Sequence, residues 1–100
     1  MERIVEVEIP VAMWREDDVV VIHSPAFELA SQGGSQEEAM KNFQEAVSLF
    51  IETIQERHVL RDTLIELGWK QTKSTWVPGS QPLPGSQTVR AKIPFENRAN

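Results

Sequence analysis

Apolar and polar residues alternate along the first segment of the chain, and this alternation predicts a β-strand. Every second residue from Val5 to Met13 is apolar, and the positions between them hold Glu6, Glu8, Pro10 and Ala12. A period of two over this length is typical of a strand that has one face on a core. Because Pro10 cannot donate a ladder hydrogen bond, we expect one unpaired side or a bulge at that position.

Two more strands are predicted further along the chain. Val19–Ile22 is an unbroken run of β-branched residues, which favours a central strand. Alternation resumes over Ala26–Gln32, where we expect Phe27 and Leu29 to point inward and Glu28 to point outward. Connections as short as these predict a three-stranded antiparallel meander.

A long amphipathic helix is predicted after the meander, followed by a short second helix. Ser35 and Glu38 fit a capping box, in which each side chain satisfies a free backbone N–H at the helix start. Apolar residues then recur at helical spacing up to about Arg57, namely at Ala39, Phe43, Ala46, Val47, Phe50 and Ile54. The second helix is predicted from Val59 to Leu67, with Gly68 as a left-handed cap.

The rest of the chain predicts a β tail. Its parts are a short strand at Trp69–Thr72, a loop rich in Pro and Gly at Trp76–Pro84, an alternating strand at Val89–Phe95 and a frayed end at Asn97–Asn100. Helices gathered on one side of a mainly antiparallel sheet define an α+β fold, and the other face of the sheet stays exposed.

Length and composition indicate one domain. A chain of 100 residues supports no more than that, so we expect residues 1–69 to form the α+β domain and residues 70–100 to add a loop and β tail packed on it. The absence of cysteine excludes disulfides, thiolate metal sites and a cysteine nucleophile. Neither a signal peptide nor an apolar run long enough to span a membrane is evident, so we expect a cytoplasmic protein without membrane contact.

The net charge of −5 is unevenly distributed. Residues 1–58 hold twelve acidic and four basic residues, whereas residues 59–100 hold three acidic and six basic residues. An acidic body repels nucleic-acid phosphates and attracts basic proteins, mainly through encounter rate and partner choice. Acidity is also ordinary for a soluble protein, so charge alone leaves both interpretations open.

Few residues offer catalytic chemistry. His23 and His58 are the candidates for a general base near neutral pH, and neither belongs to a metal-binding spacing. Glu6 and Glu8 share a strand face and could bind a divalent cation, but the patterning of an exposed strand produces the same pair. A metal-dependent nuclease would need at least two more carboxylates converging on them. We therefore predict that the protein is not an enzyme and has no catalytic, cofactor-binding or metal-binding residues.

The block from Val19 to Glu56 carries a family resemblance. It contains a strand, a proline, a polar–Gln–Gly turn, a serine cap and an amphipathic helix, and the residues concerned are Val20–Val21–Ile22, Pro25, Ser31–Gln32–Gly33, Ser35, Glu37–Glu38–Ala39, Asn42, Ala46 and Phe50–Ile51. With these motifs the chain resembles the HicB-like antitoxin family. The stretches Leu60–Trp69 and Trp76–Pro78 are also similar to a tail found on some free-standing members.

This resemblance implies a partial RNase H-like fold without the nuclease carboxylates, in a protein that forms a dimer or tetramer. It also implies a partner, a small basic HicA-like toxin of double-stranded-RNA-binding fold that cleaves messenger RNA using a histidine. The chain departs from the family at Pro25–Leu29, where a Pro-Gly-Cys-like segment is usual. Residues 70–100 offer a short β tail where many antitoxins carry a DNA-binding domain, so direct DNA binding is not expected.

We therefore predict an antitoxin-type protein that neutralises such a toxin by covering its RNA-binding face. Glu6, Glu8, Trp14 and Glu28, which we expect on the sheet face away from the helix, are the predicted partner-binding residues. A homo-oligomer interface or plain solvent exposure would explain these four residues equally well.

The alternative function is a solitary HicB-like binding or regulatory module that has no toxin partner. It predicts a pocket between the sheet and the tail, in which the indoles of Trp69 and Trp76 flank a small molecule. Both indoles could instead belong to the hydrophobic core.

Overall fold

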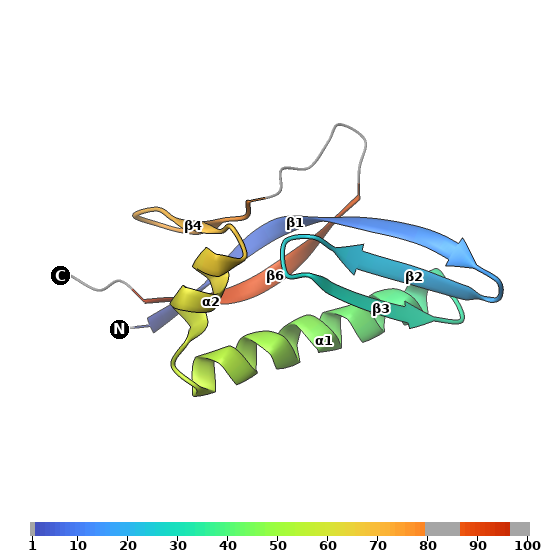
Figure 1. The fold of residues 1–100 in the computed structure, drawn as a ribbon, viewed down its shortest axis with the longest axis horizontal. Coiled ribbons are helices and arrows are strands. Elements are labelled where there is room, and N and C mark those ends of the chain that lie inside the picture. The colour runs from blue at the N-terminus through green and yellow to red at the C-terminus, as the bar shows by residue number, and fades with distance from the viewer. Residues whose placement is uncertain (1, 80–86, 97–100) are drawn as a thin grey trace.

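Four antiparallel strands and a long helix form an α+β domain (Figure 1). The computed structural model describes residues 2–79 and 87–96. Its elements are β1 (Glu2–Glu16), β2 (Val19–Ser24), β3 (Leu29–Gly33), α1 (Gln36–Glu56), α2 (Leu60–Glu66), β4 (Lys70–Gln71), β5 (Trp76–Val77) and β6 (Gln87–Glu96). The main sheet has the strand order β3-β2-β1-β6, and β4 and β5 form a separate two-stranded pair. The predicted meander of β1, β2 and β3 is confirmed, and β6 is added at its other edge.

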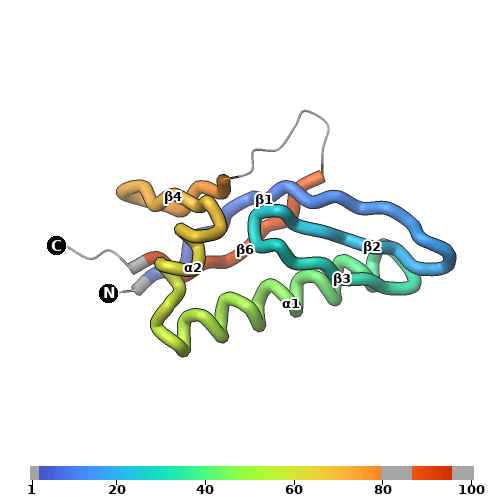
Figure 2. The backbone as a smooth tube through the Cα atoms, in the orientation of Figure 1, coloured from blue at the N-terminus to red at the C-terminus, as the bar shows by residue number. Residues whose placement is uncertain are grey.

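Strand β1 pairs with two partners along its length. Its residues from Glu2 to Val11 pair with β6, and its residues from Ala12 to Glu16 pair with β2. The tube in Figure 2 shows β1 running from the end beside β6 to the end beside β2. Pro10 lies opposite Thr88 of β6, in the part of β1 that has no ladder partner on the β2 side among the described residues. The missing N–H is therefore compatible with the local pairing, as the sequence predicts.

The core lies between the sheet and α1, which runs along one face of the sheet (Figure 1). The strands contribute the buried residues Val7, Ile9, Val11, Val20, Ile22, Val89, Ala91, Ile93 and Phe95. The helix contributes Ala39, Phe43, Val47, Ile51 and Ile54. The predicted apolar stripe is confirmed except at Ala46 and Phe50, which are only half-buried. Ile51, which the predicted stripe omits, is buried in the core.

The start of α1 is fixed by reciprocal hydrogen bonds. The Ser35 hydroxyl accepts a bond of 3.1 Å from the backbone N–H of Glu38, as a capping box requires. The Glu38 carboxylate accepts a bond of 2.6 Å from the N–H of Gly34, one residue earlier than the usual partner. Gly33 is buried against the first turn of α1. A Cβ at this position would lie only 2.6 Å from the backbone nitrogen of Ala39, so the close approach requires glycine.

A sharp turn separates the two helices. The sequence does not predict whether the chain bends or continues straight at this point. His58 adopts a positive φ of 59°, which redirects the chain between α1 and α2 without Gly or Pro. At the end of α2, Gly68 has φ +95°, so the predicted left-handed cap is confirmed. The N–H of Trp69 then donates to the carbonyl of Leu64 at 2.9 Å and turns the chain back on the helix.

Two of the predicted segments have other boundaries. Residues 25–28 form a turn rather than the start of the third strand, and Phe27 is buried from this turn while β3 begins at Leu29. Trp76 and Val77 belong to a strand, β5, rather than to a loop. The rest of that predicted loop from residue 80 and the predicted frayed end at Asn97–Asn100 lie outside the described residues.

Ser24 is the inward-facing residue at the end of β2, and its buried hydroxyl affects the stability of the fold. The side chain is 0% exposed, and its hydroxyl oxygen has no hydrogen-bond partner among the described residues. Since an unsatisfied buried hydroxyl is destabilising, Ser24→Ala should raise the free energy of unfolding by about 1 kcal/mol. Chemical denaturation monitored by circular dichroism measures this change.

The same substitution at the helix cap provides the control. Ser35→Ala removes a hydroxyl that is bonded to the Glu38 N–H, so it should lower the free energy of unfolding by about 1 kcal/mol. A loss of stability of similar size in both variants would mean that the Ser24 hydroxyl is satisfied.

Candidate interaction surface

Glu6 and Glu8 lie on the outer face of the sheet, defined as the side of β1 and β6 that faces away from α1. Both side chains are exposed, in alternation with buried Val7 and Ile9. The register of β1 and β6 places Lys92 directly opposite Glu6. Arg90 likewise lies opposite Glu8, and both basic side chains are exposed. Directly opposite residues on antiparallel strands share a face and interact, so each of the two glutamates has a basic neighbour.

Trp14 lies on the same side of β1 but in its other part. It is 40% exposed, stands opposite Val21 of β2, and donates its indole N–H to the Glu16 carboxylate at 2.9 Å. Trp14 is six positions further along β1 than Glu8, which corresponds to about 20 Å. Trp14 therefore does not form one compact patch with Glu6 and Glu8.

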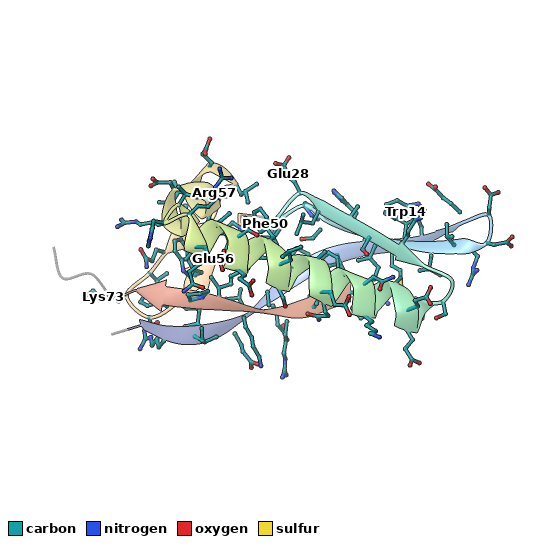
Figure 3. All side chains as sticks on the ribbon, turned by 90° about the horizontal axis from the view of Figure 1, so that it is seen from below. Trp14, Glu28, Phe50, Glu56, Arg57 and Lys73 are labelled. Atoms are coloured by element: carbon teal, nitrogen blue, oxygen red, sulfur yellow. The ribbon has the colours of Figure 1, made fainter. Side chains whose placement is uncertain are left out.

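Glu28 is the fourth predicted partner-binding residue, and it does not lie on a strand. It is an exposed residue of the turn between β2 and β3, with a positive φ of 54°. Figure 3 shows Trp14 and Glu28 at separate places along the molecule. The structure thus brings Glu6 and Glu8 together and leaves Trp14 and Glu28 apart from them and from each other.

The candidate general bases and metal ligands are also dispersed. His23 is half-buried on β2, whereas His58 is exposed in the turn between the helices. Within the described residues, no group of three or more His, Cys, Asp or Glu side chains could hold a metal ion. The additional carboxylates that a metal-dependent nuclease would need beside Glu6 and Glu8 are not found there, since the residues opposite are basic.

The two tail tryptophans are part of the core. Trp69 and Trp76 are each 2% exposed. The indole N–H of Trp69 donates to the Ala26 carbonyl at 2.8 Å, and that of Trp76 donates to the Pro94 carbonyl at 3.3 Å. Because both rings are enclosed and both N–H groups are satisfied within the protein, they do not flank a ligand pocket as the alternative function predicts.

Phe27 connects three parts of the fold around Trp69. Its ring stacks on the Trp69 indole at a centroid distance of 5.1 Å and meets the edge of Phe50 at 5.8 Å. The β2–β3 turn, α1 and the end of α2 are therefore joined by aromatic contacts. The segment Pro25–Leu29, where the chain departs from the HicB-like pattern, thus has a packing role.

The exposed side of α1 carries an acidic surface that the predicted site residues do not include. Helix α1 contains five glutamates and a single lysine. The charged surface of its second half is defined by Glu45, Glu52 and Glu56, which lie exposed around Leu49. Leu49 is 64% exposed, and helical spacings of three, four and seven residues place these four side chains on one side. Figure 3 views the molecule with this helix in front and labels Glu56 near its end.

The signal for this surface is present in the sequence, because these glutamates fall outside the apolar stripe of the helix. What the sequence does not reveal is that Glu6 and Glu8 have basic residues directly opposite them across the strands. On α1 the nearest bases along the helix are Lys41, four residues before Glu45, and Arg57, next to Glu56. An open depression of about 190 Å³, lined by Met13, Trp14, Arg15, Val20, Gln36 and Gln87, is a further feature without a sequence signal. No described helix is long and apolar enough to cross a membrane.

The chain was also compared with known proteins. No family model, curated protein or solved structure matches it.

Trp69 provides a test of the core assignment. Trp69→Phe keeps an aromatic ring against Phe27 but leaves the buried Ala26 carbonyl without its indole donor. We expect the free energy of unfolding to fall by about 1–3 kcal/mol. Trp14→Phe changes an exposed ring and should alter it by less than about 0.5 kcal/mol. Equal effects in denaturant titrations of the two variants would contradict this assignment.

Proposed function

We propose that this protein is a HicB-like antitoxin-type protein that binds and neutralises a small basic toxin that cleaves messenger RNA. The sequence block Val19–Glu56 supports the family assignment, and the order of a three-stranded meander followed by a long helix is compatible with it. We also infer the partial RNase H-like fold that this resemblance implies. In this proposal the protein acts as a cover over the cationic surface with which the toxin holds RNA.

The acidic second half of α1 is the observation that supports this function best. Glu45, Glu52 and Glu56 are exposed around a leucine that is itself 64% exposed. A toxin that binds RNA must present basic side chains to phosphates. An acidic surface with an apolar centre complements such a partner in charge, which accelerates encounter and selects against nucleic acid.

The outer face of the sheet fits this partner less well. Glu6 and Glu8 stand opposite Lys92 and Arg90, so a basic partner that approaches these four residues meets as many positive as negative charges. We therefore assign the toxin contact mainly to α1. The solitary-module alternative has weaker support, because the two indoles that it requires beside a ligand are buried.

The charge assignment is testable by comparing two pairs of reversals. Glu45→Lys together with Glu52→Lys should weaken binding to the basic protein encoded in the adjacent reading frame by about tenfold or more at low salt. The cause is repulsion between the new lysines and the cationic toxin surface. Titration calorimetry at several salt concentrations measures the affinity, and an RNA-cleavage assay measures the neutralisation.

Glu6→Lys together with Glu8→Lys is the matched control, because it changes the net charge equally on the other side of the protein. This variant should keep most of its affinity for the toxin. A larger loss in the control than in the α1 variant would move the contact to the outer face. The absence of any binding between the unmodified protein and that basic product would contradict the antitoxin function itself.

A further inference from the structure

Strand β6 is paired along one edge and open along the other. It is the last strand in the order β3-β2-β1-β6, and its only strand partner among the described residues is β1. The two prolines of the β1–β6 ladder indicate which backbone groups point to each edge. Pro10 lies opposite Thr88 and Pro94 lies opposite Ile4, so both prolines fall in the same alternate set of pairs. Since proline cannot donate a hydrogen bond, we assign this set to the pairs that do not bond to each other across an antiparallel ladder.

Two side-chain hydrogen bonds agree with this assignment. The carbonyl of Pro94, which should point away from β1, accepts from the indole N–H of Trp76 at 3.3 Å. The same alternation, carried across β1 and β2, places the carbonyl of Gln32 on the outer edge of β3. There it accepts from the Asn42 amide at 2.8 Å. One consistent pattern of backbone directions therefore holds across the whole sheet.

The open edge of β6 is defined here by Thr88, Arg90 and Lys92. These residues belong to the set whose N–H and C=O groups point away from β1. Their backbone groups have no hydrogen-bond partner among the described residues, and their side chains are exposed. The edge closes at Pro94, which has no N–H and whose carbonyl is bonded to Trp76. From Thr88 to Lys92 the edge is about 14 Å long, enough for an extended segment of about five residues.

We propose that the open edge of β6 binds an extended segment of a partner protein as an added antiparallel strand, and that this segment carries acidic side chains at alternate positions. Strand addition of this kind obtains its affinity from backbone hydrogen bonds and its specificity from alternate side chains. The open edge offers both, since its free backbone groups lie beside the bases Arg90 and Lys92 on one face of the sheet. Carboxylates directly opposite these two bases would form favourable cross-strand pairs.

Strand β1 shows the side-chain pattern that β6 accepts. Across the existing ladder Glu6 and Glu8 lie opposite the two bases, and Val7 between them lies opposite Ala91. Alternating acidic and apolar residues thus place carboxylates beside the bases and an apolar side chain on the buried face. The open edge presents the same β6 side chains in the same order, because each strand residue contacts neighbours on both of its sides. A segment of the form Glu-Val-Glu-Val-Glu therefore matches it.

Other occupants fit the open edge less well. A basic segment, or β6 of a second copy, would place like charges directly opposite Arg90 and Lys92, which is destabilising. A nucleic-acid strand could contact the two bases but would leave the outward carbonyls of β6 without donors. Basic side chains also protect an edge strand from unspecific pairing. The same two charges that repel these strands attract an acidic one.

A titration with synthetic peptides tests the proposal. The probe is the peptide Glu-Val-Glu-Val-Glu with blocked ends, and the matched peptide has lysine in place of each glutamate. NMR spectra of the isotope-labelled protein should show that the glutamate peptide shifts the backbone amide signals of Thr88, Arg90 and Lys92. The lysine peptide should bind about tenfold more weakly, because the cross-strand charge pairs change sign.

Methylation of the peptide nitrogens separates strand addition from simple charge attraction. In the proposed register the glutamates face the outward backbone groups of β6, so their N–H groups donate to it and those of the valines point away. Methyl groups on the glutamate nitrogens should therefore abolish binding, whereas methyl groups on the valine nitrogens should preserve it.

A variant of the protein tests the side-chain specificity. Arg90→Gln together with Lys92→Gln keeps the open backbone groups and removes both charges, so it should bind the glutamate and lysine peptides with similar affinity. Circular dichroism verifies that this variant is folded.

Three outcomes would overturn the inference. These are the absence of shifts along β6 at millimolar glutamate peptide, equal affinity of the unmodified protein for the two peptides, and equal loss of binding on methylation at either set of nitrogens. The inference does not depend on the toxin-binding function, because the partner segment is acidic and no toxin is present in these measurements.

Discussion

The first part of strand β1 pairs with β6 and its last part pairs with β2, and this division of one strand between two ladders determines the arrangement of the domain. Its inward residues Val7, Ile9 and Val11 are buried beside β6, and Met13, in the part that pairs with β2, is half-buried against the same core. A single helix, α1, can therefore lie across strands from both ladders. The outward-facing residues of β1 are not covered by α1. Glu6 and Glu8 lie in the part of β1 that pairs with β6, and the exposed Trp14 lies in the part that pairs with β2.

The sequence was sufficient to predict features that depend on local chemistry. The alternation in β1 and β6, the Ser35 cap and the Gly68 turn each follow from neighbouring residues, and each is found in the structure. Phe27 was misplaced in a strand because its alternation with Leu29 resembles a β pattern. It is buried instead by stacking on Trp69, a contact between residues distant in the chain. No local pattern encodes such a contact.

The candidate surfaces differ in how far the sequence could reveal them. The acidic side of α1 follows from helical spacing, since Glu45 and Glu52 are seven residues, or about two helical turns, apart and therefore lie on the same side of the helix. The partners of Glu6 and Glu8 depend on the register between β1 and β6, which is set by packing of the whole sheet. The two surfaces therefore differ: the glutamates in the second half of α1 surround the exposed Leu49, whereas Glu6 and Glu8 each stand opposite a base on β6.

The pairing of β1 with β6 also affects how the chain can fold as it is synthesised. The opening strand of the protein can complete its ladder only after the residues of β6 leave the ribosome, because Glu2 lies opposite Glu96. Until then, the backbone groups of β1 from Glu2 to Val11 lack their strand partner, while β2, β3 and α1 are already available. Contacts between the two ends of a chain form slowly, and unpaired apolar strands are prone to aggregation in nascent proteins. The alternating glutamates and Pro10 in this strand would limit such association during that interval.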